Sequence, residues 1–80
     1  MDLTLHILSP EGPVLETGAD LVTLPGAAGL FTVLKDHAPI VTALVKGNVR
    51  YVSEGKEELV PIKEGFAEVR NNTVTVCAEV

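Results

Sequence analysis

Residue types that could do chemistry on their own are few and isolated in this chain. Histidine occurs twice, at His6 and His37, and Cys77 is the only cysteine. A structural zinc site needs several ligands at recognised spacings, and neither histidine has such neighbours. One cysteine excludes an intramolecular disulfide, and the apolar run around Cys77 predicts a small buried hydrophobe rather than a reactive thiol. We therefore expect no metal site and no cofactor.

Other catalytic motifs are missing as well. A nucleophile elbow needs Gly-x-Ser-x-Gly at a strand-to-helix turn, and neither Ser9 nor Ser53 has it. The Gly-Ala-Ala-Gly sequence at 26–29 has the glycine spacing of an RNA-clamping loop but lacks its basic flanks and helices. The 11 acidic residues single out no pair for acid–base catalysis. We expect no catalytic residues, and no enzymatic activity from the chain by itself.

The composition indicates one globular domain over residues 1–80. Hydrophobic residues make up 46% and charged residues 21% of the chain, which disfavours disorder. The net charge of −5 and the 6 scattered basic residues disfavour nucleic acid and an anionic membrane surface as partners. No apolar run approaches the ~20 residues of a membrane-spanning helix, and the N-terminus lacks the pattern of a signal peptide. We expect a soluble cytoplasmic domain without direct membrane insertion, which reaches a membrane only through a partner.

Strands must position these residues, because apolar and polar residues alternate in short runs separated by turn residues. The expected strands span residues 3–7, 14–17, 19–24, 31–34, 40–45, 49–52, 57–62, 66–70 and 73–80. Pro61 confines its strand to a sheet edge or a strand end, since proline cannot donate to a ladder. No run has apolar residues at helical spacing. The sequence therefore predicts an all-β fold, a small antiparallel β-sandwich or barrel with little or no helix.

Three turns carry predictions of their own. Pro25-Gly26 is expected to turn the chain after the third strand. Lys46-Gly47-Asn48 has the length and residue types of a hairpin loop. Asn71-Asn72 is expected to form a two-residue turn in which both residues tolerate positive φ.

Residues 24–44 combine turn chemistry with apolar side chains in an unusual way. Ala27, Ala28 and Leu30 occupy a glycine-rich turn, whereas loops are normally polar and solvated. One interpretation is that the glycines and prolines only shape turns in a sandwich. The other, which we favour, is that apolar loop residues are covered by another protein.

An ordered set of short motifs resembles the N-terminal domain of the ATP synthase epsilon subunit. The motifs are Ser9-Pro10-Glu11-Gly12, Leu24-Pro25-Gly26-x-x-Gly29-x-Phe31, Leu34, His37-Ala38-Pro39, Thr42-Ala43-Leu44, Gly65-Phe66-x-Glu68-Val69, Asn72 and Val74-Thr75-Val76. The resemblance runs in order from Leu3 to Glu79. It implies that the β-sandwich is flattened. It also implies a non-catalytic rotor subunit, present as one copy in the central stalk of the proton-translocating F-type ATP synthase. Such a subunit couples proton flow to ATP synthesis at the cytoplasmic face of the bacterial inner (plasma) membrane.

The resemblance also implies two contact surfaces. The residues that match the family's contact with the gamma subunit are Ser9, His37, Pro39 and Thr42. The residues that match the loop offered to the membrane-embedded c-ring are Ala27, Ala28, Gly29 and Leu30. The family often has an acidic residue in that loop, where Ala28 and Leu30 stand here. We therefore expect an apolar or backbone-mediated contact with the c-ring.

Two departures from the family's pattern concern the loop before His37 and the end of the chain. Lys35-Asp36 replaces the common Pro-Gly and Thr32 replaces a glycine, which is expected to stiffen the loop because non-glycine residues disfavour positive φ. The family typically continues into a C-terminal helical hairpin that binds ATP in some members and inhibits hydrolysis. The sequence stops at Val80, as in a natural short form, which we favour, or in a longer protein that has been cut. We expect no helix-mediated inhibition from residues 1–80.

Two other functions remain as alternatives. Acidic all-β domains of this size also carry lipoyl or biotinyl groups on a lysine at a hairpin turn. Lys35 and Lys56 are the turn lysines that could serve, although neither has the expected flanking pattern. A generic β-sandwich adaptor with other protein partners is the second alternative.

Overall fold

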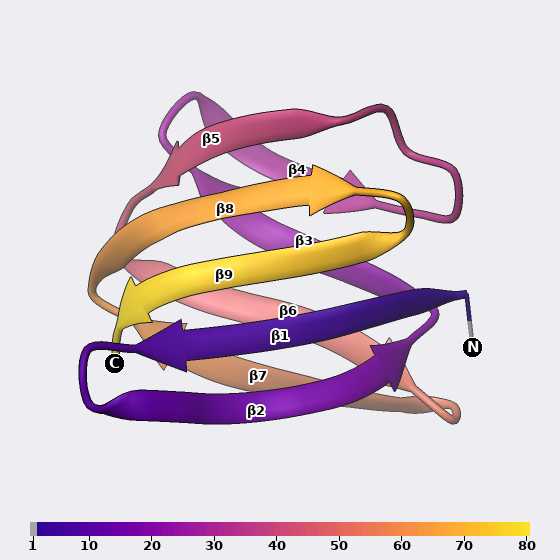
Figure 1. The fold of residues 1–80 in the computed structure, drawn as a ribbon, viewed down its shortest axis with the longest axis horizontal. Helices are drawn as coiled ribbons and strands as arrows, with labels where there is room; N and C mark the ends of the chain where they lie inside the picture. Colours follow the sequence, from indigo (N-terminus) through magenta and orange to yellow (C-terminus); the bar gives the residue numbers. More distant parts are fainter. Residues whose placement is uncertain (1) are drawn as a thin grey trace.

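The computed structural model describes residues 2–80 and confirms the all-β prediction. Nine strands and no helix occur over this range, and Figure 1 shows their arrangement. The strands are β1 (Leu3–Ser9), β2 (Gly12–Ala19), β3 (Leu21–Gly26), β4 (Gly29–Val33), β5 (Ile40–Leu44), β6 (Gly47–Ser53), β7 (Lys56–Ile62), β8 (Glu64–Arg70) and β9 (Thr73–Glu79). Each of them overlaps one of the nine runs expected from the alternation of apolar and polar residues.

The strands form one curled sheet that folds over itself into two layers. Hydrogen bonds link them in the order β2-β1-β9-β8-β5-β3-β6-β7, and β4 pairs with β3. The nearer layer in Figure 1 contains β5, β8, β9, β1 and β2, and the more distant layer contains β4, β3, β6 and β7. The layers join where β5 meets β3 at the single pair Gly26 and Leu44. Pro61 lies in β7, an edge strand as predicted.

The core lies between the two layers and is built mainly from alternate residues of β1, β6, β8 and β9 together with the buried residues of β3. Leu5 and Ile7 of β1, Val76 of β9 and Leu24 of β3 are fully buried there. Among the described residues no polar or charged side chain is buried. Burial of this aliphatic surface drives the layers together, because each buried CH₂ group contributes about 0.8 kcal/mol.

The β8–β9 hairpin confirms the turn expected at Asn71-Asn72. The strands pair up to Arg70 and Thr73, which leaves the two asparagines as the loop. Their φ angles are 51° and 59°. Asparagine tolerates these left-handed values better than most residues, which is why this two-residue turn can close the hairpin.

The other two turn predictions are wrong. Pro25-Gly26 lies within β3, and the chain turns at Ala27-Ala28 instead. The carbonyl of Pro25 faces the end of β5, where it accepts the N–H of Val45, the residue directly after that strand, at 2.9 Å. The nitrogen of a strand residue faces the same side as its carbonyl, so the N–H that proline lacks is not needed in the β3–β4 ladder. The pairing of β3 with β4 therefore continues past Pro25 to Gly26 and Gly29.

The segment expected as a hairpin loop at 46–48 is a crossing between the layers. β5 pairs with β8, whereas β6 pairs with β3 and β7. Gly47 begins β6 at a close approach, since a Cβ there would lie 2.9 Å from the Cβ of Pro25. Glycine is needed at this position to let the chain pass Pro25 rather than to form a tight turn.

Candidate protein-binding surface

The outer face of the nearer layer carries a row of apolar side chains across four adjacent strands. The strand register places Leu8 of β1 opposite Cys77 of β9, Cys77 opposite Phe66 of β8, and Phe66 opposite Ala43 of β5. Phe66 is 53% exposed. We call Leu8, Cys77, Phe66 and Ala43 the apolar row. Such a row on a small protein is a candidate contact surface for another protein.

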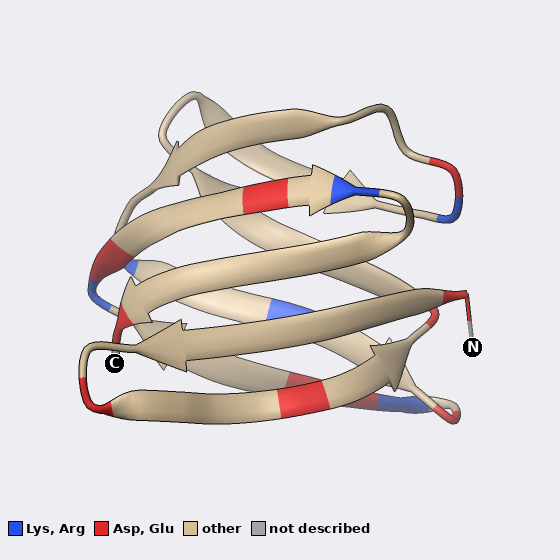
Figure 2. Cartoon of the chain, viewed as in Figure 1, with Lys and Arg blue, Asp and Glu red and all other residues tan. Residues whose placement is uncertain are grey.

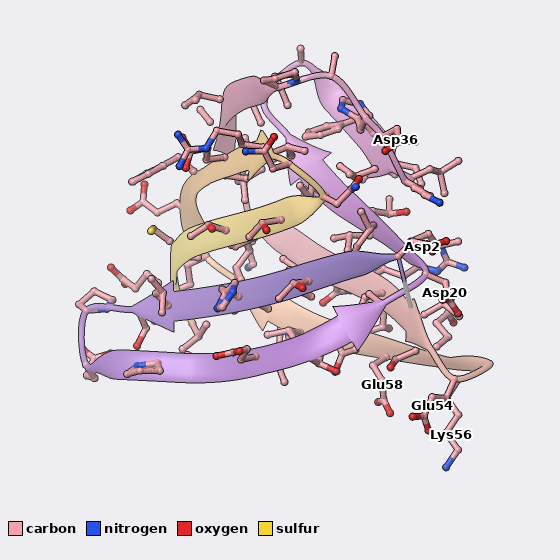
Figure 3. The ribbon with its side chains drawn as sticks, turned by 45° about the vertical axis from the view of Figure 1, so that its right-hand side comes forward. Asp2, Asp20, Asp36, Glu54, Lys56 and Glu58 are labelled. Carbon is pink, nitrogen blue, oxygen red and sulfur yellow. The ribbon has the colours of Figure 1, made fainter. Side chains whose placement is uncertain are left out.

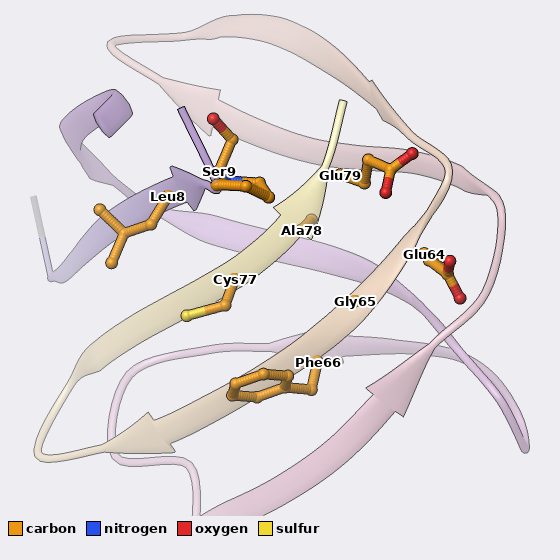
Figure 4. Close-up of a pocket in the computed structure, with 9 residues that line it drawn as sticks. Leu8, Ser9, Glu64, Gly65, Phe66, Cys77, Ala78 and Glu79 are labelled. Carbon is orange, nitrogen blue, oxygen red and sulfur yellow. The ribbon is translucent and has the colours of Figure 1, made fainter. Parts of the chain in front are cut away.

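Three residues of the apolar row, Leu8, Cys77 and Phe66, line an open hollow of about 420 Å³ (Figure 4). Ser9 and Pro10 border one end of the hollow, and the carboxylates of Glu64 and Glu79 lie on its rim. The Glu79 carboxylate pairs with the ammonium of Lys63, with 3.9 Å between Oε1 and Nζ. The hollow therefore has an apolar floor and an acidic rim, which suits an apolar side chain of a partner better than a polar ligand.

Glycine at position 65 brings β8 against β9 beneath the apolar row. A Cβ at Gly65 would lie 2.2 Å from the carbonyl oxygen of Cys77 and 2.7 Å from the Cα of Ala78. No side chain fits at those distances. The absence of a side chain at Gly65 therefore lets β8 and β9 lie close together beside Phe66.

Cys77 corrects one expectation from the sequence, since its thiol is half-buried rather than buried in the core. Val76 and Ala78 on either side are the buried residues of β9. Successive residues of a strand face opposite sides, so Cys77 belongs to the outer face. The run of apolar residues concealed this alternation in the sequence.

A second candidate surface lies at the connection between β4 and β5, residues 34–39. The N–H of Asp36 donates to the Oδ1 of Asn72 at 2.7 Å, and the Nδ2 of Asn72 donates to the Oδ1 of Asp36 at 3.3 Å. Asp36 adopts a φ of 63°, although we expected its residue type to disfavour positive φ. Aspartate is one of the residues that enter this region most readily, and the paired hydrogen bonds hold it there.

The β3–β4 turn forms an exposed apolar tip. Ala27 and Ala28 make the turn, and Gly29 follows with a φ of 132°. Leu30 is 76% exposed. The N–H of Ala27 donates to the carbonyl of Ala43 at 2.9 Å, which ties the tip to β5. The tip thus offers a leucine side chain and backbone groups to a partner.

Charged residues lie mainly at turns and strand ends, as Figure 2 shows. Glu54, Lys56 and Glu58 project from the β6–β7 hairpin (Figure 3), and Lys35 is exposed in the β4–β5 connection. Within residues 2–80 no group of three or more histidine, cysteine or acidic residues is arranged to hold a metal ion. In the same range, no helix is long and apolar enough to cross a membrane.

Comparison with protein families gives a match over nearly the whole chain. Residues 2–80 match the family described as ATP synthase, Delta/Epsilon chain, beta-sandwich domain. The chain belongs to this family. It is 42% identical over 76 residues to the ATP synthase epsilon chain of Desulfitobacterium hafniense strain Y51, covering 95% of this chain and 58% of that one. It is 44% identical over 79 residues to that of Anaeromyxobacter sp. strain Fw109-5, covering 99% and 60%.

The chain therefore spans about 60% of the length of these relatives. Solved structures agree with the fold. A chain of the Euglena gracilis mitochondrial ATP synthase matches with a TM-score of 0.89 and 24% identity, covering 96% of this chain and 50% of that chain. A chain of the Tetrahymena thermophila mitochondrial ATP synthase, solved as central stalk and c-ring, matches with a TM-score of 0.81 and 11% identity, covering 100% and 65%.

The residues that the family resemblance relates to gamma do not form one cluster. His37 and Pro39 border the same cavity of about 230 Å³ in the β4–β5 connection. Ser9 lies at the far end of the nearer layer, where its Oγ accepts the N–H of Glu11 at 3.3 Å and donates to the carbonyl of Gly12 at 3.1 Å (Figure 1). Thr42 is half-buried in β5. The four residues thus border the layer that carries the apolar row.

Sequence reasoning missed the apolar row and the contact between Asp36 and Asn72. The row depends on the register of strands that are not consecutive, and the paired residues are 36 positions apart in the chain. One signal could have found part of the row: Phe66 alternates with the apolar residues Ala67 and Val69, so it falls on the outward phase of its strand.

Proposed function

We propose that this chain provides the β-sandwich of an ATP synthase epsilon subunit. In this role it is a non-catalytic part of the rotor that binds the gamma subunit and contacts the c-ring, and so couples proton flow to ATP synthesis. The enzyme complex holds it at the cytoplasmic face of the bacterial inner membrane. The family match over residues 2–80 and the bacterial relatives described as ATP synthase epsilon chains support this proposal.

The exposure of the apolar row is the observation that carries the proposed gamma contact. Phe66 of the row is 53% exposed, and Val41, which lies beside the row on the same face of β5, is 70% exposed. Ser9 lies at one end of this face and the loop with His37 at the other, so a single partner that covers the row would reach both. Exposed aromatic side chains of this kind become the energetic centre of an interface when a partner buries them.

The tip formed by Ala27, Ala28, Gly29 and Leu30 is the proposed contact with the c-ring. No acidic residue is present in these four positions. A contact made by Leu30 and backbone groups does not depend on a salt bridge. It should therefore be less sensitive to ionic strength than a contact made by opposite charges.

Affinity for the purified gamma subunit of the same organism tests the proposal. Phe66→Ser should weaken binding about 30-fold, because loss of a central interface aromatic costs ~2 kcal/mol or more. Leu59→Ser is the matched control, since Leu59 is 54% exposed on β7 in the other layer. It should change the affinity less than twofold. A wild-type chain that does not bind gamma overturns the proposal, and equal losses in both variants would place the contact elsewhere.

A further inference from the structure

We propose that Asn72 is a positioning residue whose side-chain amide holds the β4–β5 connection in the conformation that gamma recognises. The inference rests on the proposed function, because it concerns the loop that carries His37 and Pro39. It adds a role for the β8–β9 turn, which does not itself carry any of the residues related to the gamma contact.

The contact between the two loops is reciprocal and directional. The amide of Asn72 accepts the backbone N–H of Asp36 at 2.7 Å and donates to its carboxylate at 3.3 Å. The two loops lie at the same end of the nearer layer, on the right in Figure 1. An asparagine side chain supplies both an acceptor and a donor, and both are used here on one residue.

The backbone at Asp36 shows why the loop needs this contact. Its φ of 63° lies in the left-handed region, which is uncommon for residues other than glycine. Such a conformation persists only where surrounding contacts determine it. Within the connection, the N–H of His37 donates to the carbonyl of Leu34 at 3.1 Å, which closes the turn directly after Asp36. Without Asn72, this turn would be one of several conformations of an exposed loop.

Pre-setting the loop matters for how fast gamma binds. Only the fraction of molecules with the loop in the competent conformation can bind productively, so the apparent affinity scales with that fraction. Loss of the Asn72 side chain should lower the association rate constant and leave the dissociation rate constant nearly unchanged, since gamma itself holds the loop once bound. A side chain that touched gamma directly would act mainly on dissociation.

Asn72→Gly and Asn71→Gly form a matched pair for the experiment. Both positions have positive φ, which glycine adopts freely, so the turn can keep its shape in either variant. Asn72→Gly removes both hydrogen bonds and should reduce the association rate constant at least roughly fivefold, the factor that corresponds to the net contribution of a single hydrogen bond. Asn71→Gly should change it less than twofold. Hydrogen exchange of the Asp36 amide should become roughly fivefold faster in Asn72→Gly only.

A reciprocal exchange provides the rescue. Asn72→Asp alone places a second carboxylate against that of Asp36 and should slow association, because the two like charges repel. Adding Asp36→Asn restores one amide and one carboxylate with the same total charge. Both residue types tolerate positive φ, so the double variant should associate within twofold of the wild type.

The possible results separate this inference from the proposed function. If the wild type binds gamma and Asn72→Gly associates at the wild-type rate, the positioning role is wrong and the gamma contact stands. The same conclusion follows if the double variant stays as slow as Asn72→Asp, or if the loss appears in dissociation. If the wild type fails to bind gamma, the proposed function is wrong, and the role of Asn72 in recognition falls with it. Retained protection of the Asp36 amide in Asn72→Gly would overturn the contact itself.

Discussion

Gly65 shows how a single missing side chain shapes the proposed interface. A Cβ at this position would lie only 2.2 Å from the carbonyl oxygen of Cys77 in β9, so only the Cα hydrogen of glycine fits there. Backbone atoms move at a higher cost than the end of a flexible side chain. A larger residue at position 65 must therefore separate β8 from β9 next to Phe66.

We expect Gly65→Ala to lower the free energy of unfolding by about 1–3 kcal/mol, the usual range for overpacking. Urea denaturation monitored by circular dichroism measures this change. Glu68→Ala is the control, because Glu68 is exposed on the same strand and its replacement should cost less than about 0.5 kcal/mol. Similar losses in the two variants would show that the close approach at Gly65 is not what makes glycine necessary.

At the scale of the element, the β3–β4 hairpin has separate residues for stability and for contact. Leu24 is fully buried between the layers, whereas Leu30 on the partner strand is 76% exposed. The two strands pair from Val22 with Val33 to Gly26 with Gly29, so the buried base and the exposed tip form one rigid hairpin. The buried residues around Leu24 therefore hold the tip in place, and Leu30 at the tip stays free for the proposed contact with the c-ring.

Alanine at these two leucines should separate the two roles. Leu24→Ala removes buried methyl groups and leaves a cavity, and should lower the free energy of unfolding by about 2–5 kcal/mol. Leu30→Ala should change it by less than about 0.5 kcal/mol. Denaturant unfolding of both variants gives the comparison. A large loss in Leu30→Ala would mean that the tip packs against the sandwich and is not free for a partner.

The elements were predictable from the sequence to different degrees. Alternation located all the strands, and residue type gave the turn at Asn71-Asn72, because both are local properties. Strand pairing is not local: Lys46-Gly47 resembles a hairpin loop, yet β5 and β6 do not pair. The apolar row and the contact of Asp36 with Asn72 also arise from strand register. Local patterns left open whether the strands form a sandwich or a barrel, and the motifs shared with the epsilon subunit family indicated a sandwich.

At the scale of the whole molecule, Cys77 is a natural reporter for the proposed interface. Its thiol is half-buried in the apolar row and lines the hollow beside Phe66. It is also the only cysteine, so any thiol reagent that labels the chain reports on this one position. A partner that covers the nearer layer would cover it as well.

We expect saturating gamma to slow alkylation of Cys77 by a maleimide at least tenfold, because the reagent then reaches the thiol only when the complex opens. Intact mass spectrometry follows the reaction. Cysteines of gamma are replaced beforehand, and the chain unfolded in urea gives the rate of the free thiol. Unchanged labelling in a complex shown to have formed would place gamma on another face.

The parallel pairing of β1 with β9 has a consequence for how the protein folds during synthesis. β1 begins at Leu3 and β9 ends at Glu79, yet the two strands are hydrogen-bonded neighbours inside one layer (Figure 1). The ribosome releases the first strand long before the last. The edge of β1 that pairs with β9 therefore stays unpaired until almost all of residues 1–80 have emerged. Pairing between distant segments is slow, and unpaired strands are prone to aggregation. The nearer layer can therefore be completed only at the last step of folding, and with it the surface proposed to join the rotor.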